Sequence, residues 1–201
     1  GVYADMDIAI TNQGKYNPED VQKINYLIET SDLEATVDTP ESWSDFASWD
    51  NATPKNLIEL DFSEKTDVFS RVVDINNFSK LAALTMGNQP RMTSLVCANS
   101  QLSSLDVSGL SNISSLNCSW NVITSLDISG LSNLSYLDCS GNQLQSLDVS
   151  GLSNLTSLNC SINQITSLDV SGLAYLILLD CSSNQLNSLD VKDLSNLYTL
   201  Y

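Results

Sequence analysis

Apolar residues recur with a period of 21 residues through region 95–201 of the chain. Five copies of one unit begin at Leu95, Leu116, Leu137, Leu158 and Leu179. The second copy shows the apolar set: Leu116, Cys118, Ile123, Leu126, Ile128, Leu131 and Leu134. A fixed period of this size is typical of a solenoid, in which each coil buries its apolar face only against its neighbours.

Each copy opens with Leu-x-Cys, followed in the last four copies by x-x-Asn, and its alternation of inward and outward residues predicts a short strand. Because successive copies share one register, we expect these strands to pair in parallel along one face. The Ser-Gly-Leu-Ser-Asn-Leu segment that follows predicts turns and short helical segments. The outward residues expected on the strand face are Ser94, Val96, Ala98; Ser115, Asn117, Ser119; Tyr136, Asp138, Ser140; Ser157, Asn159, Ser161; Leu178, Asp180, Ser182.

Two columns of identical residues run through the copies. The first holds Cys97, Cys118, Cys139, Cys160 and Cys181, and the second Asn121, Asn142, Asn163 and Asn184. A thiol at an aliphatic strand position behaves as a small hydrophobe, and the spacing lacks the closely paired ligands of zinc modules. We therefore predict a ladder of reduced, buried thiols beside a structural ladder of amides that satisfy turn backbone.

A third column is acidic: Asp106, Asp127, Asp148, Asp169 and Asp190. Like charges about 5 Å apart repel by ~0.8 kcal/mol per neighbouring pair in water, so something must offset the repulsion. One interpretation is that each carboxylate accepts hydrogen bonds from the turn that follows. The other is a row of weak calcium contacts, although the spacing lacks the loop of an EF-hand. The first interpretation is favoured, and we predict neither a metal site nor a cofactor.

The pattern Leu-x-x-Leu-x-Cys-x-x-Asn-x-Leu resembles the leucine-rich repeat of bacterial proteins. The echo of Leu-Asp-Cys-Ser at 137 by Leu-Asp-Val-Ser at 147 is similar to the nested subclass called IRREKO, and the remainder of the unit resembles the internalins. The resemblance covers 95–201. It implies a leucine-rich repeat solenoid, α/β or mainly β, with a parallel sheet on the concave face and turns, short strands or 3-10 segments on the convex face. Function is not implied, because such repeats serve many unrelated partners.

Upstream of residue 95 the repeat continues in degenerate form, over 57–94. Residues 73–86 align without a gap on 147–160, which places Met86 in the cysteine column, and the step from Leu84 to Leu95 then suggests a shortened or irregular coil. The alternation in 56–62 predicts a first strand.

Residues 1–56 lack the repeat and are expected to form a small helical cap. Pro18 and the acids beside it, ahead of Val21, Ile24, Leu27 and Ile28, predict an amphipathic helix, and a second short helix is expected through Trp43, Phe46 and Trp49.

The chain contains no histidine, which excludes Ser-His-Asp and Cys-His catalysis and imidazole zinc sites. Its formal net charge is −16, and Lys192 is the only positive side chain in 95–201. Phosphate binding needs a basic footprint, so nucleic acid is an unsuitable partner. The sequence has no apolar run of 18 residues, so we expect no membrane insertion.

These observations favour a non-enzymatic scaffold, secreted or at the bacterial surface, that binds a protein or glycan through its concave sheet. The candidate binding residues are Asn117, Trp120, Tyr136, Asp138, Asn159, Leu178 and Asp180, with the strongest contribution expected around Trp120 and Tyr136. The alternatives are a structural spacer or adhesin stalk and, more distantly, a hydrolase that uses two carboxylates. We predict no catalytic residues.

Overall fold

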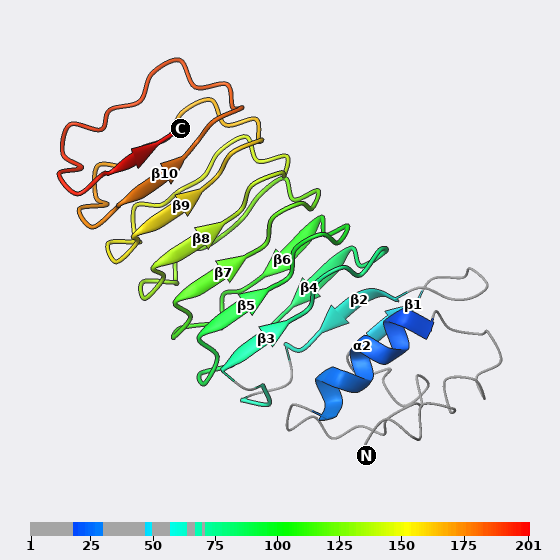
Figure 1. Ribbon diagram of the computed structural model, residues 1–201. Helices are drawn as coiled ribbons and strands as arrows, with labels where there is room; N and C mark the ends of the chain where they lie inside the picture. Colours follow the sequence, from blue (N-terminus) through cyan, green and yellow to red (C-terminus); the bar gives the residue numbers. More distant parts are fainter. Residues whose placement is uncertain (1–17, 30–46, 50–56, 64–66, 70) are drawn as a thin grey trace.

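A computed structural model describes residues 18–29, 47–49, 57–63, 67–69 and 71–201. These residues form a solenoid of short stacked strands with helix α2 at one end and the last strand at the other (Figure 1). The elements are α2 (Pro18–Glu29), β1 (Ala47–Trp49), β2 (Leu57–Asp61), β3 (Val72–Asp74), β4 (Ala83–Thr85), β5 (Ser94–Val96), β6 (Ser104–Asp106), β7 (Ser115–Asn117), β8 (Tyr136–Asp138), β9 (Ser157–Asn159), β10 (Leu178–Asp180) and β11 (Thr199–Leu200).

The larger sheet has seven parallel strands in the order β11-β10-β9-β8-β7-β5-β3. Its register places Leu95, Leu116, Leu137 and Leu158 beside one another, as identical copies in one phase must do. The middle residue of each three-residue strand is buried, while its two neighbours face outward. This sheet is the predicted parallel sheet, and the solenoid fold is confirmed.

A second sheet lies on the other half of the coils. Strands β2, β4 and β6 pair in parallel, and β1 adds to β2 in the antiparallel sense. The predicted first strand is therefore present as β2. Beyond β6, the matching segments of later coils form turns and extended backbone without strand pairing.

The two sheets correct the predicted alignment of the degenerate repeats. Val73 pairs with Leu95 in the larger sheet, and Leu84 pairs with Leu105 in the second. Met86 thus lies in the column of Val107, and Ile75 takes the column of Cys97. The predicted shortened coil was wrong, because Leu84 and Leu95 belong to opposite halves of a coil of ordinary length.

Helix α2 docks on the first coils through one buried carboxylate. Asp20 is buried, and its Oδ2 accepts a hydrogen bond of 2.9 Å from the Leu57 N–H. Ile24 enters the common core, and Lys23 Nζ lies 4.8 Å from the centre of the Phe78 ring. The predicted amphipathic helix is confirmed. The second predicted helix is wrong at Trp49, which lies in β1, while Trp43 and Phe46 fall outside the described residues.

Candidate functional site

The outward columns of the seven-stranded sheet form its exposed face. Tyr136 and Leu178 lie at the first outward position of their strands, and Asn117, Asp138, Asn159 and Asp180 at the second. The third predicted outward column is wrong, because the chain has already turned inward there and only its last member is exposed. The buried members are Ala98, Ser119, Ser140 and Ser161.

The side chains of the second outward column also stabilise the turn that follows each strand. Asp138 Oδ1 accepts hydrogen bonds from the Ser140 N–H at 3.0 Å and the Ser140 hydroxyl at 2.6 Å, and the same turn recurs at Asn117, Asn159 and Asp180. This turn was not predicted from the sequence. Amides and carboxylates alternate along the column, so carboxylates are separated by two strand spacings, about 10 Å. The face is therefore mildly acidic.

Tyr136 lies on this face in the first outward column, paired with Ser115 and Ser157 of the neighbouring strands. Partial burial raises the pKa of its phenol, and the neighbouring Asp138 carboxylate raises it further. The phenol is therefore neutral over the physiological range, and its ring and hydroxyl offer an amphipathic contact.

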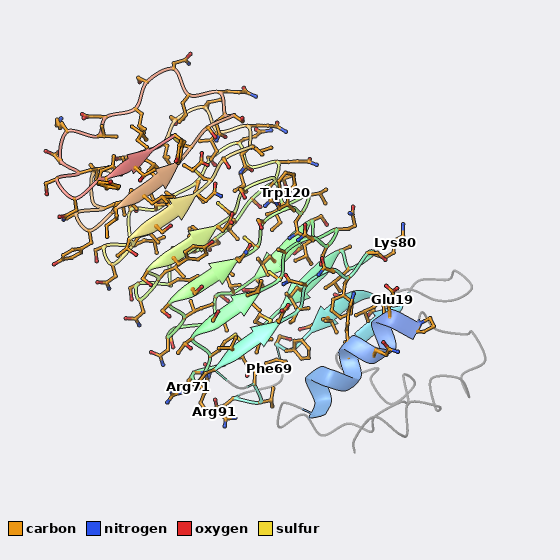
Figure 2. The ribbon with its side chains drawn as sticks, viewed as in Figure 1. Glu19, Phe69, Arg71, Lys80, Arg91 and Trp120 are labelled. Atoms are coloured by element: carbon orange, nitrogen blue, oxygen red, sulfur yellow. The ribbon has the colours of Figure 1, made fainter. Side chains whose placement is uncertain are left out.

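In the seven-stranded sheet, the third residue after each strand from β3 to β10 has left-handed backbone. This trailing-edge column holds Asn77, Asn99, Trp120, Gly141, Ile162 and Ser183, with φ between 53° and 63°. Glycine and asparagine adopt this conformation readily, whereas a β-branched side chain is strained there. Trp120 and Ile162 are nevertheless 55% and 46% exposed. We call Trp120, Gly141 and Ile162 the trailing-edge strip; Figure 2 shows Trp120 on the side to which the strand arrows point.

Trp120 depends on the glycine of the next coil. A Cβ placed on Gly141 would lie 2.9 Å from both Cδ2 and Cε3 of the indole, so the ring lies directly against the Gly141 backbone. The strip therefore presents one large aromatic face, supported by a residue without a side chain.

A second apolar cluster lies where the strands begin and was missed by the sequence analysis. Tyr175, Ile177 and Tyr198 are large exposed residues just before β10 and β11. Together with Asn154, Thr156 and Asn196 they line a groove of about 780 Å³, which we call the leading-edge groove. A signal was present in the sequence: each of the three interrupts a column of Asn, or of Ser and Thr, that earlier copies maintain.

The thiol and amide columns lie inside the stack. Cys97, Cys118, Cys139 and Cys160 are buried free thiols, and Cys181 in the last coil is partly exposed. Burial raises the pKa of Cys118 and of Cys160 to about 12, so these thiols are protonated and unreactive at neutral pH.

The amide column connects successive coils. Asn142 donates from Nδ2 to the carbonyls of Cys118, Cys139 and Ser140, and its Oδ1 accepts the Ile123 N–H at 3.0 Å. The same bonds recur at Asn121, Asn163 and Asn184. Each amide thus joins two coils. Asn121, Asn142 and Asn163 are buried, whereas Asn184 in the last coil is partly exposed.

The acidic column makes turns of the same kind as the second outward column. Oδ1 of each aspartate accepts the N–H two residues ahead, at 2.9 to 3.1 Å, in Asp106, Asp127, Asp148, Asp169 and Asp190. This N–H bond lowers the pKa of Asp127, Asp148 and Asp169. Over the described ranges, no three His, Cys, Asp or Glu side chains converge as metal ligands.

The stacked coils, with a Leu-x-x-Leu-x-Cys-x-x-Asn strand and turn, define a leucine-rich repeat solenoid. The family model described as leucine-rich repeats (2 copies) matches residues 132–175. An internalin of Listeria monocytogenes is similar in structure, with a TM-score of 0.54 and 20% identity over 69% of this chain and 49% of its own. A leucine-rich repeat protein of Leptospira interrogans has a TM-score of 0.52 and 28% identity over 60% of this chain and 36% of its own.

The predicted resemblance to bacterial leucine-rich repeat proteins, internalins among them, is confirmed. The chain spans about half the length of the internalin and about a third of the Leptospira protein. No curated protein matches the sequence. Among the described residues, no helix has the length and apolar character needed to cross a membrane.

Proposed function

We propose that the chain is a non-enzymatic interaction scaffold that binds a protein through the seven-stranded sheet, secreted or at the bacterial surface. The observation that carries the proposal is the trailing-edge strip. Trp120 and Ile162 occupy backbone that glycine or asparagine would adopt without strain, yet about half of the surface of each residue is exposed. Folding gains little from this choice, whereas exposed tryptophan and tyrosine are frequent anchors of protein interfaces.

The rest of the contact surface lies on the rigid sheet beside the strip. Tyr136 supplies a second aromatic contact, and Asn117, Asp138, Asn159 and Asp180 supply polar contacts whose orientation the following turn fixes. Leu178 adds apolar surface near the C-terminal end. Such pre-ordered side chains lose little conformational entropy on binding. A glycan ligand for this face is the alternative occupant.

Alanine at Trp120, Tyr136 and Asp138 together tests the proposal. A binding protein is first captured on the immobilised full chain and then purified, and its affinity is measured by calorimetry for the wild type, the triple variant and a matched control. The control is Gln145→Ala with Thr166→Ala, two exposed residues outside the sheet. We expect at least a tenfold loss for the triple variant alone. Equal affinities for all three chains would reject the sheet as the binding face.

A spacer or adhesin stalk is the competing function, in which the repeats only set reach. Deletion of residues 158–178 removes one 21-residue unit, keeps the phase of the remaining coils and leaves Gly141 beside Trp120. A spacer tolerates the deletion, because its length changes by one coil only. A surface that spans several coils loses affinity, because Asn159, Ile162 and Leu178 are removed.

A further inference from the structure

Two columns along the leading edge normally bond each coil to the one before it. Asparagine Nδ2 donates to a carbonyl of the preceding coil at 2.7 to 2.9 Å in Asn112, Asn133, Asn154 and Asn196. Two residues further on, a hydroxyl does the same at 2.9 to 3.1 Å in Thr93, Ser114, Ser135 and Thr156. Both columns are therefore structural in most coils.

Three side chains interrupt these columns in two adjacent coils. Tyr175 stands in the asparagine column, and Ile177 and Tyr198 stand in the hydroxyl column. Within residues 71–201, these three positions make none of the inter-coil side-chain hydrogen bonds of their columns. Their side chains are instead 62%, 50% and 90% exposed. Replacing residues that make inter-coil hydrogen bonds by exposed apolar ones does not stabilise the array, so stability does not explain these three residues.

The leading-edge groove that they line combines aromatic faces with oxygen acceptors. Asn154 and Asn196 turn Nδ2 toward the preceding coil, so neither Oδ1 has a partner in the described part of the chain. Thr156 has already donated its hydroxyl hydrogen to Ser135 O, which leaves its oxygen able to accept. A ligand that brings hydrogen-bond donors and a flat apolar face is therefore complementary to the groove.

The charge around the groove favours a positively charged ligand over a negatively charged one. Its lining holds no positive side chain. Region 95–201 carries eight acidic residues and one basic residue, Lys192, which is already paired with Asp190 at 2.8 Å. An anionic group finds no countercharge here, whereas a cation is attracted by the surrounding field and by the tyrosine rings.

We propose that the leading-edge groove binds an arginine side chain, flanked by aliphatic residues, of a protein partner. A guanidinium has five donors and no acceptor, and it stacks flat on aromatic rings, which matches the acceptors and the two phenols. Aliphatic neighbours would cover Ile177. The site lies on a different edge from the trailing-edge strip, so it goes beyond the proposed function and does not depend on it.

The test uses the full chain, labelled with ¹⁵N, and three capped tripeptides of the form acetyl-Leu-X-Leu-amide. X is arginine, the neutral isostere citrulline, or glutamate. We expect the arginine peptide to shift amide resonances of residues 154–156, 175–177 and 196–198 at low salt. Citrulline should bind about two- to fivefold more weakly, since it keeps only three of the five donors, gains a carbonyl acceptor and loses the cation–π attraction. Glutamate should not bind.

A variant that restores the columns separates recognition from structure. Tyr175→Asn with Ile177→Thr and Tyr198→Ser should abolish the shifts while the thermal midpoint stays equal or rises, because the inter-coil hydrogen bonds return. Trp120→Ala with Tyr136→Ala is the matched control and should bind the arginine peptide as the wild type does. That control lowers affinity only for the partner of the seven-stranded sheet, so the two proposals fail separately.

Four outcomes would overturn the inference. Citrulline or glutamate peptides could bind as tightly as the arginine peptide, or the shifts could fall outside the groove. Maltohexaose could shift the groove residues while the arginine peptide does not, which would make the groove a glycan site. A column-restored variant that unfolds at a lower temperature would make the three residues structural.

Discussion

The indole of Trp120 rests on the backbone of Gly141 in the next coil, where any added Cβ would lie 2.9 Å from two ring carbons. Both residues have left-handed backbone, with φ of 55° and 63°. The exposed tryptophan of one coil therefore requires glycine in its neighbour, and this pair joins the proposed binding strip to the repeat itself.

Gly141→Ala should destabilise the array by about 1–2 kcal/mol, since alanine is strained at this φ and its methyl displaces the indole. Urea unfolding followed by circular dichroism measures the loss, and tryptophan fluorescence reports the displacement. Gly130→Ala is the control, because its nearest neighbour would lie 3.9 Å away and should be accommodated. Equal losses in both variants would show that the indole does not lie against residue 141.

Ile162→Asn should raise stability by about 1 kcal/mol. Isoleucine is strained at φ 54°, whereas asparagine tolerates left-handed backbone and already stands in this column at Asn99. The same change should weaken binding to the proposed sheet partner, because apolar contact surface is removed. Thermal unfolding measures the stability of Ile162→Asn, with Thr166→Asn as the control. Thr166 is exposed, so we expect its substitution to change the unfolding free energy by no more than about 0.5 kcal/mol. A loss of stability at 162 would mean that packing of Ile162 outweighs its strain.

The sequence predicted the solenoid well because every copy repeats the same burial pattern, and a stack has one phase that satisfies all copies. It failed for the degenerate coils for a related reason. Each unit contains two similar halves, so Val73 and Leu84 each fit either half, and only strand pairing assigns them to β3 and β4. The prediction of a helix at Trp49 was wrong because a short apolar segment fits a helix or an edge strand equally well.

Candidate site residues were harder to predict, because outward side chains carry no burial pattern. Tyr175 and Tyr198 lie ahead of the strands, where strand alternation does not indicate which side chains are exposed. Asp138 and Asp180 are outward strand positions in the sequence pattern, but the turn that each closes depends on the position of a serine N–H, which only the structure gives. In such chains, a residue that interrupts a column of an otherwise exact repeat is the better signal of a binding site.

Asn142→Ala should destabilise the array by about 2 kcal/mol, because it leaves the buried Ile123 N–H without a partner. The carbonyls of Cys118 and Cys139 lose one bond each but keep those from Asn121 and Asn163. Asn184→Ala removes the same set of bonds in the last coil, where water reaches the freed groups, and should cost about 1 kcal/mol. Urea midpoints of both variants give the comparison. Equal costs would show that burial does not determine the strength of the amide column.

The thiols should react in two classes. At pH 8, one equivalent, Cys181, should react quickly with Ellman's reagent, and the other four only on unfolding. Burial raises the folded pKa of Cys118 and Cys160 from 9.0 to about 12, so the folded state binds more protons than the unfolded state between these values. The contribution of these two thiols to stability is therefore full below pH 9 and falls by up to about 1.4 kcal/mol per pH unit per thiol between pH 9 and pH 12.

Cys118→Val tests the alkaline loss directly. The variant lacks one buried titrating group, so its unfolding free energy should fall less steeply than that of the wild type between pH 9 and pH 11. Unfolding by urea at fixed pH steps measures both slopes. Equal slopes of unfolding free energy against pH in the two chains would contradict the burial of protonated cysteines. Rapid reaction of more than one thiol in the folded chain would contradict it as well.

The acidic column should stabilise the array only in its ionised form. Folding lowers the pKa of Asp127, Asp148 and Asp169 through the N–H that each carboxylate accepts, so the gain is present above pH 4 and is lost as pH falls through the lowered folded values. Asparagine at all three keeps the turn without titrating, so that variant should lose less of its thermal midpoint between pH 6 and pH 3. Millimolar calcium should move neither midpoint, because one oxygen of each carboxylate is already engaged. A rise in the wild type alone would make the column a cation site.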